Sequence, residues 1–262
     1  MLLMPPLCWA GNAVVARALV GQFPPLALSC LRWVLAFAFL LPFAWHQWHA
    51  QRHALKGHTW MIGLMSLLGV GVYNSFQYLA LQTSPVLNVT LIAASAPVFV
   101  LLTGALFFGE RIYMRQLLGA AVSICGVLAV LLRGQWTQLL ELRIAAGDAW
   151  MLAAAASWAV YTWLIRRHRP AMDGVPFLAM QMAIGSALIA PFALWEGASG
   201  ASVVWSSSAL WGLLFVATFP SLVAYWCWDI GVARAGAVVP RARLSNSIKR
   251  KKAAAAKVEL NI

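Results

Sequence analysis

The sequence predicts an all-α integral membrane protein made of two inverted five-helix repeats. Hydrophobic residues make up 62% of its 262 residues and charged residues only 10%, and the chain carries 14 tryptophans. At a mean hydropathy of +0.78, a water-soluble domain of this length could not keep so much apolar surface out of water. Long apolar stretches and an internal repeat complete the prediction.

The apolar stretches are of the length that a membrane-spanning helix needs. Crossing the ~30 Å hydrocarbon core takes about 20 residues as a helix. Barrel strands would need alternating segments of about 10 residues, and the chain lacks that pattern. Eight apolar stretches are bounded by charges or turn-forming residues, at residues 2–20, 25–45, 60–81, 86–108, 116–132, 149–165, 175–195 and 210–230.

Residues 1–72 recur 149 positions further along the chain. The matches are Trp9-Ala10 with Trp158-Ala159, Arg17 with Arg166, Pro42-Phe43-Ala44 with Pro191-Phe192-Ala193, and Gly63-Leu64 with Gly212-Leu213. Self-similarity at a fixed period indicates a duplicated unit. The first copy holds an odd number of spans, five, so the second copy begins from the opposite side of the membrane. Inverted repeats of this kind are typical of secondary transporters that work by alternating access.

The repeat predicts two domains and an anomalous tail. We expect a first repeat at residues 1–133 and a second, inverted repeat at residues 147–240, in which three helices are recognisable. Two further apolar spans should follow Pro240, but residues 241–262 carry seven basic residues and one acidic residue. We interpret this tail as an artefact or as misassigned last helices. A polybasic segment that binds anionic lipid headgroups is the alternative.

Basic residues in the connecting segments predict the orientation. The loops on one side of the predicted membrane hold only two basic residues, Arg133 and Arg143. The loops on the other side form the richer set and hold Arg52, Lys56, Arg111, Arg115, Arg166, Arg167 and Arg169. By the positive-inside rule the richer set is cytoplasmic, and so is the amino terminus. A signal peptide is the alternative for the first stretch, but residues 1–20 lack a basic n-region and match the interior of the second repeat.

Several motifs resemble the EamA-type family of the drug/metabolite transporter superfamily. They are Trp9-Ala10-Gly11-Asn12, Leu31-Arg32, Ala80-Leu81-Gln82-Thr83-Ser84-Pro85, Ala96-Pro97 and Phe108-Gly109-Glu110-Arg111, with a partial return at 231–237. The resemblance covers residues 1–240. It implies ten spans in two inverted five-helix repeats, both termini in the cytoplasm of a bacterium, and export of amino acids or related metabolites across the inner membrane. In its many tryptophans, the chain most resembles the aromatic amino-acid exporters of the YddG type. The chain departs from the family at Ala10, where glycine is usual, and in its last two helices.

Polar residues within apolar spans are candidate binding residues, because a polar group in hydrocarbon is costly. Helical spacing places several of them on shared faces, together with aromatic residues deep in the spans. The expected substrate-binding residues are Trp9, Asn12, Tyr73, Asn74, Gln77, Tyr78, Asn88, Ser95, Trp158, Tyr161, Trp163, Gln181, Ser221, Tyr225 and Trp228. Packing between helices is the alternative for Asn88 and Ser95.

Arg32 is the deepest full charge of the first half, and the repeat relates it to Gln181. Its side chain either snorkels to the outer interface or faces the cavity and meets a substrate carboxylate. Glu110 is expected to brace Arg111 or Arg115. Tryptophans near span ends are expected in the interfacial belt, namely Trp33, Trp45, Trp48, Trp60, Trp150, Trp195, Trp205 and Trp211.

The charge pattern favours a neutral or zwitterionic substrate. No Asp or Glu lies near the midplane of a predicted span, which argues against antiport of protons and organic cations. Amides and hydroxyls suit the polar end of such a substrate, and aromatic faces suit its side chain. We therefore predict a secondary transporter that exports amino acids, aromatic or other neutral ones, and related metabolites. A broad-specificity drug or nucleotide-sugar carrier is the alternative.

Other function classes are not expected, nor is any cofactor or metal. The histidines at 46, 49, 53 and 58 are interpreted as solvated near the headgroups, and the four cysteines inside spans as packing residues. The basic excess lies in loops and the tail, so no folded basic surface is expected to bind nucleic acid. The expected partners are a small-molecule substrate and the lipid bilayer, and the expected state is a monomer, with a dimer as the alternative.

Overall fold

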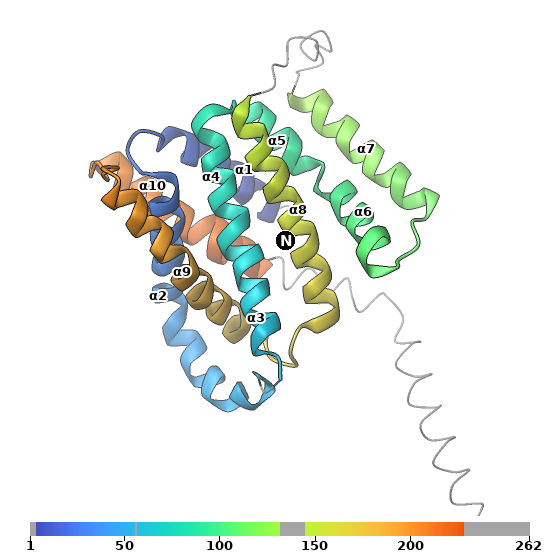
Figure 1. Ribbon diagram of the computed structural model, residues 1–262, viewed down its shortest axis with the longest axis horizontal. Helices are drawn as coiled ribbons and strands as arrows, with labels where there is room; N and C mark the ends of the chain where they lie inside the picture. Colours follow the sequence, from blue (N-terminus) through green and yellow to red (C-terminus); the bar gives the residue numbers. More distant parts are fainter. Residues whose placement is uncertain (1–3, 56, 132–144, 228–262) are drawn as a thin grey trace, which may run out of the picture.

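A computed structural model describes residues 4–55, 57–131 and 145–227. These residues form α-helices with short 3-10 and π-helical stretches, and no strand occurs among them, so the all-α prediction is confirmed. In chain order they are α1 Met4–Ala18, α2 Pro25–Gln51, η1 Arg52–Leu55, α3 Thr59–Ser66, η2 Leu67–Val72, α4 Tyr73–Thr83, α5 Val86–Ala94, α6 Ala96–Phe108, α7 Met114–Leu131, α8 Ala146–His168, α9 Gly174–Ala198, α10 Ser207–Thr218 and η4 Phe219–Val223 (Figure 1).

Each of the eight predicted spans falls on a helix or on a consecutive group of helices. In the described part of the chain, four segments are long and apolar enough to cross a membrane: Pro25–Gln51, Thr59–Thr83, Gly174–Ala198 and Ser207–Cys227. Helices α5 and α6 would together make a fifth. The ten-helix count stays a prediction, and the tail at 241–262 lies outside the described residues.

Helices α5 and α6 meet at a bend of 43°. Helix α5 ends at Ala94, and α6 begins at Ala96, one residue before Pro97. A proline has no backbone N–H, and its ring clashes with the carbonyl four residues earlier. Pro97 therefore explains why this predicted span is not one straight helix.

Two spans contain π-helical stretches at positions that the repeat relates. The stretch η2 lies between α3 and α4, and η4 follows α10. A shift of 149 residues places η2 at 216–221, so the two stretches overlap in the repeat. π-helical turns within α-helices are often found at functional sites.

Helices related by the repeat pack in a reciprocal pattern. Helix α2 lies against α9, its own counterpart, and α1 contacts α10 and η4 as α8 contacts their counterparts α3 and η2. Helices α2 and α9 are also tied near both ends. Leu26 N and Ala27 N donate to Glu196 Oε2 at 3.0 and 2.9 Å, and Gln51 Nε2 donates to Asp173 Oδ2 at 2.6 Å. The two halves therefore meet along the pair of helices α2 and α9.

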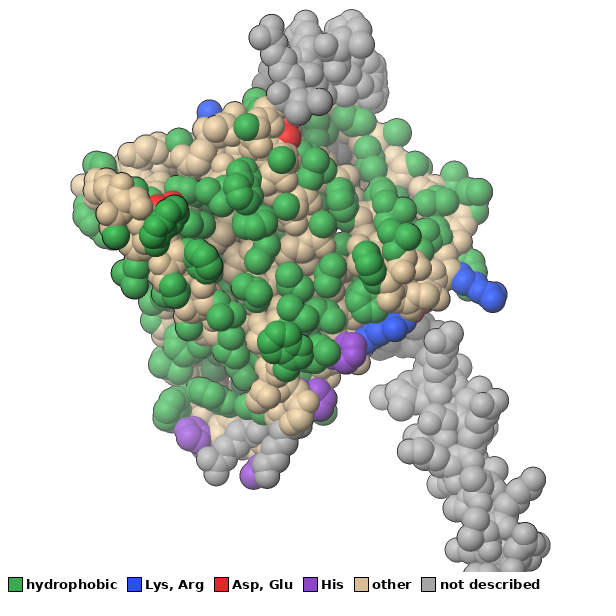
Figure 2. All heavy atoms as spheres, in the orientation of Figure 1, with side chains coloured by type: hydrophobic (Ala, Val, Ile, Leu, Met, Phe, Trp, Pro, Cys, Tyr) green, Lys and Arg blue, Asp and Glu red, His purple; other side chains and the backbone are tan. Residues whose placement is uncertain are grey.

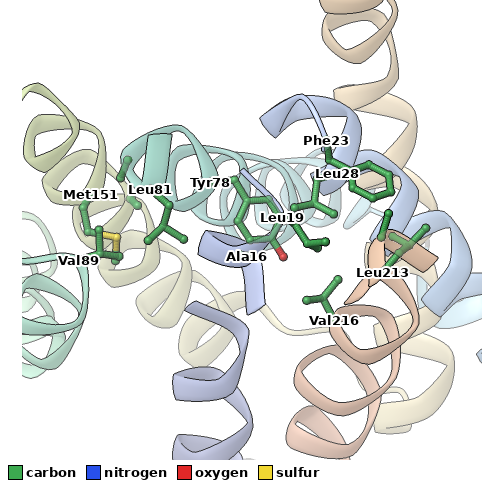
Figure 3. Packing of buried hydrophobic residues seen from close by; sticks show 13 residues of the cluster. Ala16, Leu19, Phe23, Leu28, Tyr78, Leu81, Val89, Met151, Leu213 and Val216 are labelled. Carbon is green, nitrogen blue, oxygen red and sulfur yellow. The ribbon is translucent and has the colours of Figure 1, made fainter. Parts of the chain in front are cut away.

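The largest apolar cluster joins α1, α4, α8 and α10. Tyr78, Leu81, Met151, Leu213 and Val216 are among its buried members (Figure 3). Because this cluster surrounds the Tyr78 ring, it fixes the position of α4 against α1.

The outer surface is largely apolar. In Figure 2, hydrophobic side chains cover most of the visible face, while arginines and histidines gather along its lower edge. Phe107 is 76% exposed and Trp60 75%, which would be unfavourable in water but not in lipid. The distribution fits a multi-pass membrane protein.

Candidate functional site

Arg32 is buried among the helices and is only 1% exposed. Its Nε donates to Ser221 Oγ at 2.7 Å, and its Nη1 donates to Tyr78 OH at 2.7 Å, to Asn74 Oδ1 at 2.9 Å and to Asn12 Oδ1 at 3.3 Å. All four acceptors are neutral, and Arg32 forms no ion pair with any described residue. Of the two predicted orientations, the structure therefore has the inward one.

The polar network continues beyond the guanidinium. Tyr78 OH donates to Asn12 Oδ1 at 2.9 Å, and Asn12 Nδ2 donates to Gln77 Oε1 at 3.0 Å. These side chains come from α1 and α4, and all of them are buried. We call Arg32 with Asn12, Asn74, Gln77, Tyr78 and Ser221 the arginine network.

The arginine network is attached to both π-helical stretches. Asn74 Nδ2 donates to Gly69 O in η2 at 3.2 Å, and Ser221, which lies in η4, donates to Val216 O at 2.8 Å. Arg32 thus connects the irregular segments of both halves, through Ser221 within η4 and through Asn74 of α4, which bonds to η2.

A second polar pair occupies the repeat-related positions. Tyr161 OH donates to Gln181 Oε1 at 2.9 Å, and the repeat relates Tyr161 to Asn12 and Gln181 to Arg32. Tyr161 also lies against Gly69, where any Cβ would overlap its ring. The same two positions are therefore bonded in both halves, but only the first half carries a charge there.

Aromatic rings from both halves adjoin these polar groups. Trp158 lies 4.9 Å from Tyr73 and 5.1 Å from Tyr161, measured between ring centroids. Trp9 lies 6.1 Å from Trp158 and 6.2 Å from Tyr225. With Trp33, which lies 6.0 Å from Tyr225, these rings form what we call the aromatic cluster: Trp9, Trp33, Tyr73, Trp158, Tyr161 and Tyr225.

The prediction that Trp33 belongs to the interfacial belt is wrong. Trp33 is 0% exposed, the Arg32 Cζ lies 4.4 Å from its ring centroid, and its buried Nε1 has no hydrogen-bond partner in the described part of the chain. Its face of α2 turns toward the bundle, which position in the sequence alone does not reveal. Trp45, Trp60 and Trp211 are 53%, 75% and 71% exposed, as a belt requires.

Asn88 and Ser95 contact other groups. Asn88 Nδ2 donates to Asp148 Oδ2 at 2.9 Å. Ser95 Oγ donates to Ile92 O at 2.7 Å, at the bend between α5 and α6. The structure therefore does not bring these two residues into the arginine network.

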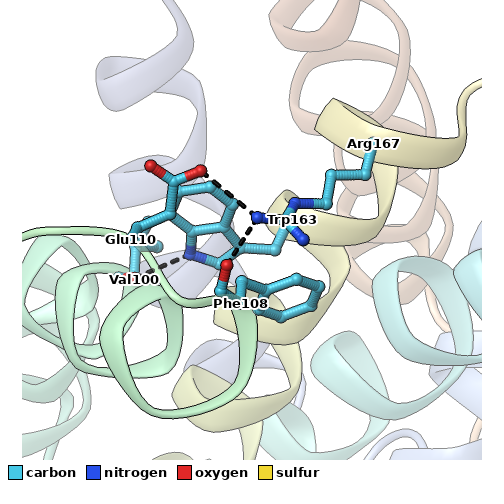
Figure 4. A network of polar contacts seen from close by, with 5 residues as sticks. All are labelled: Val100, Phe108, Glu110, Trp163 and Arg167. Carbon is cyan, nitrogen blue, oxygen red and sulfur yellow. Dashed lines mark hydrogen bonds and ion pairs between the residues drawn. The ribbon is translucent and has the colours of Figure 1, made fainter.

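Trp163 belongs to the contact between α6 and α8. Its Nε1 donates to Val100 O at 2.8 Å, and its ring stacks on Phe108 with centroids 5.5 Å apart (Figure 4). Beside it, Glu110 pairs with Arg167 at 3.3 Å, so the expectation of a partner at 111 or 115 is wrong. Trp228, the last predicted site residue, lies outside the described residues.

Asp148 is a buried carboxylate that sequence reasoning missed. It is 8% exposed and accepts from Ser84 Oγ at 2.7 Å, Asn88 Nδ2 at 2.9 Å and Ala145 N at 2.9 Å. Burial alone would raise the pKa of this carboxyl, but the hydrogen bonds from Ala145, Ser84 and Asn88 outweigh burial and lower it. An acidic residue in the first turn of a predicted helix could have indicated an N-terminal capping contact, though not its partners.

The geometry suits binding of a small molecule. The guanidinium can donate to an anionic group, and the aromatic cluster can receive an apolar one. Within the described ranges, no three or more His, Cys, Asp or Glu side chains are grouped to hold a metal ion.

Comparison with known families decides the class of protein. The sequence model of the EamA-like transporter family matches residues 1–132 and 145–240. The chain belongs to the EamA-like transporter family. The resemblance carried by the sequence motifs is thereby confirmed, and the family name and the names of relatives indicate a membrane transporter rather than an enzyme.

Relatives of this EamA-like protein carry transporter names. An uncharacterized transporter of Archaeoglobus fulgidus is 28% identical over 90% of this chain and 80% of its own length. A probable amino-acid metabolite efflux pump of Escherichia coli K12 is 29% identical, over 86% of this chain and 75% of its own. A probable terminal-alkyne amino-acid exporter of Streptantibioticus cattleyicolor is 29% identical, over 66% and 56%.

A solved crystal structure supports the fold of the EamA-like chain. It superposes with a TM-score of 0.63 at 23% sequence identity, and the match covers 88% of this chain and 77% of that one. At this identity the likeness shows the fold alone.

Proposed function

We propose that this EamA-like protein exports amino acids, aromatic or other neutral ones, and related metabolites across the inner membrane of a bacterium. The observation that carries the proposal is Arg32, a buried cation whose described partners are all neutral oxygen atoms. A substrate carboxylate would neutralise this charge and form charge-assisted hydrogen bonds with it. Relatives named for amino-acid or metabolite export support the substrate class.

Transport proceeds by alternating access between two inverted repeats, at residues 1–133 and 147–240, with the amino terminus in the cytoplasm. Arg32 of the first repeat bonds to Ser221 of the second, so a substrate at Arg32 would lie between the halves. The reciprocal helix packing and the paired π-helical stretches support this arrangement. Side chains from both halves of one chain build the site, which supports a monomer.

The predicted site residues divide into two groups in this mechanism. Asn12, Asn74, Gln77, Tyr78 and Ser221 orient the arginine and contact the polar end of the substrate. Trp9, Tyr73, Trp158, Tyr161 and Tyr225, with Gln181, receive its side chain.

Uptake into proteoliposomes tests the proposal. Labelled amino acids are offered with and without a pH gradient, and saturable uptake of an aromatic or other neutral amino acid is expected. Transport of a cationic dye in place of every amino acid would instead support the broad-specificity carrier and would refute the exporter assignment.

A further inference from the structure

We propose that the Arg32 site prefers monoanions over zwitterions: carboxylates that carry an apolar or aromatic group and no compensating ammonium. Amino acids whose amine is lost or acylated belong to this class. The inference rests on the proposed function and narrows its substrate from amino acids to their anionic relatives.

The site carries one uncompensated positive charge among the described residues. Four carboxylates lie in the described ranges, and each is engaged away from Arg32. Glu110 pairs with Arg167, and Asp148 accepts from Ser84. Asp173 accepts from Gln51 Nε2, and Glu196 accepts from the backbone N–H groups at the start of α2. The described surroundings of Arg32 therefore leave its full positive charge without a counterion.

The site has a surplus of hydrogen-bond donors. Among the described residues, Trp33 Nε1 is buried with no acceptor, next to a guanidinium whose hydrogen bonds all run through Nε and Nη1. Trp33 is 0% exposed and its ring lies 4.4 Å from Arg32 Cζ. A buried donor without an acceptor is unfavourable. Carboxylate oxygens are acceptors only, so an anion supplies what the site lacks, and Trp33 becomes a second binding residue beside Arg32.

The ammonium group of an amino acid is unfavourable beside Arg32. A bound monoanion brings the charge of the arginine network to zero, whereas a zwitterion leaves one uncompensated positive charge in apolar surroundings. The aromatic cluster offers ring faces to an ammonium, but Arg32 already lies over the Trp33 ring and repels a second cation. The site therefore holds the carboxylate more tightly when no ammonium accompanies it.

Three compounds with one carbon skeleton test the preference. Phenylalanine is the zwitterion, hydrocinnamate is phenylalanine without its amino group, and phenethylamine is phenylalanine without its carboxylate. Binding of each labelled compound to the full chain in lipid nanodiscs is measured at neutral pH, with empty nanodiscs as the blank. We expect hydrocinnamate to bind at least about tenfold more tightly than phenylalanine, because Arg32 repels the ammonium of phenylalanine at a buried site. Phenethylamine should bind most weakly, because it keeps the ammonium and lacks the carboxylate.

Two variants connect the preference to its residues. Trp33→Phe keeps an aromatic ring, a smaller one, but removes the indole N–H, and it should weaken hydrocinnamate binding several-fold while phenethylamine binding stays unchanged. Trp211→Phe, at a 71% exposed position, is the matched control and should change neither. Arg32→Gln should abolish the difference between hydrocinnamate and phenylalanine. If that variant does not fold, Trp33→Phe and the ligand series still decide the matter.

The outcomes separate this inference from the proposed function. Phenylalanine binding as tightly as hydrocinnamate, with uptake of phenylalanine into proteoliposomes, would overturn the preference for monoanions and leave the exporter assignment standing. If none of the three compounds bound or moved while a cationic dye did, both proposals would fall. An unchanged affinity of Trp33→Phe for hydrocinnamate would remove Trp33 from the site.

Discussion

Replacing Asp148 by Ala should destabilise the protein much more than replacing it by Asn. The carboxylate accepts three hydrogen bonds, from Ser84, Asn88 and the Ala145 N–H. Without it, the Ala145 N–H loses its acceptor and Asn88 Nδ2 loses this hydrogen bond, whereas the Ser84 hydroxyl can rotate to another acceptor. An unsatisfied buried donor costs about 1–3 kcal/mol and a lost hydrogen bond about 1 kcal/mol, so the Ala variant should lose about 2–4 kcal/mol of unfolding free energy.

The Asn variant can keep the geometry. Its amide oxygen can accept from Asn88 and Ala145, and its NH₂ can donate to the Ser84 hydroxyl, so only the charge assistance is lost, about 1–2 kcal/mol. Asp173→Ala is the matched control, because Asp173 is exposed and accepts one side-chain hydrogen bond, from Gln51. Thermal unfolding in detergent, followed by fluorescence, should rank the wild type as most stable, the Asp148→Asn variant next and the Asp148→Ala variant last.

The pH dependence of this stability difference follows from the lowered pKa of the Asp148 carboxyl. A group whose folded pKa lies below its unfolded value, about 3.9 for Asp, stabilises the fold above the unfolded value and ceases to do so as pH falls through the folded value. The difference between wild type and Asp148→Ala should therefore be constant from neutral pH to about pH 5 and narrow only below about pH 4. A difference that shrinks between pH 7 and 5, or a loss no larger than that of Asp173→Ala, would refute this account.

Three further predictions test the assignment of roles. Tyr78→Phe removes the hydroxyl that bonds to both Asn12 and Arg32. The variant should lower proteoliposome uptake about tenfold at a normal yield of folded protein. Uptake at the wild-type rate would contradict the place of Tyr78 in the site. Gly69→Ala puts a Cβ into the Tyr161 ring and should lower the free energy of unfolding by about 1–3 kcal/mol. An unaltered melting temperature would show that η2 can shift to make room for the methyl group. Glu110→Gln breaks an exposed ion pair and should change stability by less than about 1 kcal/mol; a larger loss in the same assay would mean that this contact does more than join α6 to α8.

The positions of the helices were predictable from sequence because apolar length alone decides them in a membrane. The eight apolar stretches coincide with helices, and the repeat-related prolines Pro42 and Pro191 both lie inside them, in α2 and α9. The breaks inside spans were not predictable. The hydropathy of the stretch 67–72 does not distinguish a π-helical segment from an α-helix, because all six residues are leucine, valine or glycine.

The arginine network was predictable as a set of polar residues on inward faces, but its membership was not. Asn88 is as polar as Asn74, and its helical spacing says nothing about which neighbour it meets. Asn88 contacts Asp148 while Asn74 contacts Arg32, a difference set by the packing of α5 against α8 and of α4 against α2. Trp33 was wrongly assigned to the interfacial belt although it lies well inside α2, because the sequence does not show which side of that helix faces the bundle.

The repeat offers two equivalent positions between the halves, and the chain fills them differently. Position 32 carries arginine, and its counterpart at 181 carries glutamine, each bonded to the residue that the repeat aligns, Asn12 or Tyr161. A second arginine at 181 would add another buried cation and its desolvation cost. One charge and one amide give the two ends of the site different chemistry, so a substrate between the halves should bind in a single orientation. We therefore expect Gln181→Arg to weaken binding of a monoanion with one carboxylate and to favour a dicarboxylate, and equal affinity for both in that variant would show that Gln181 does not face the substrate.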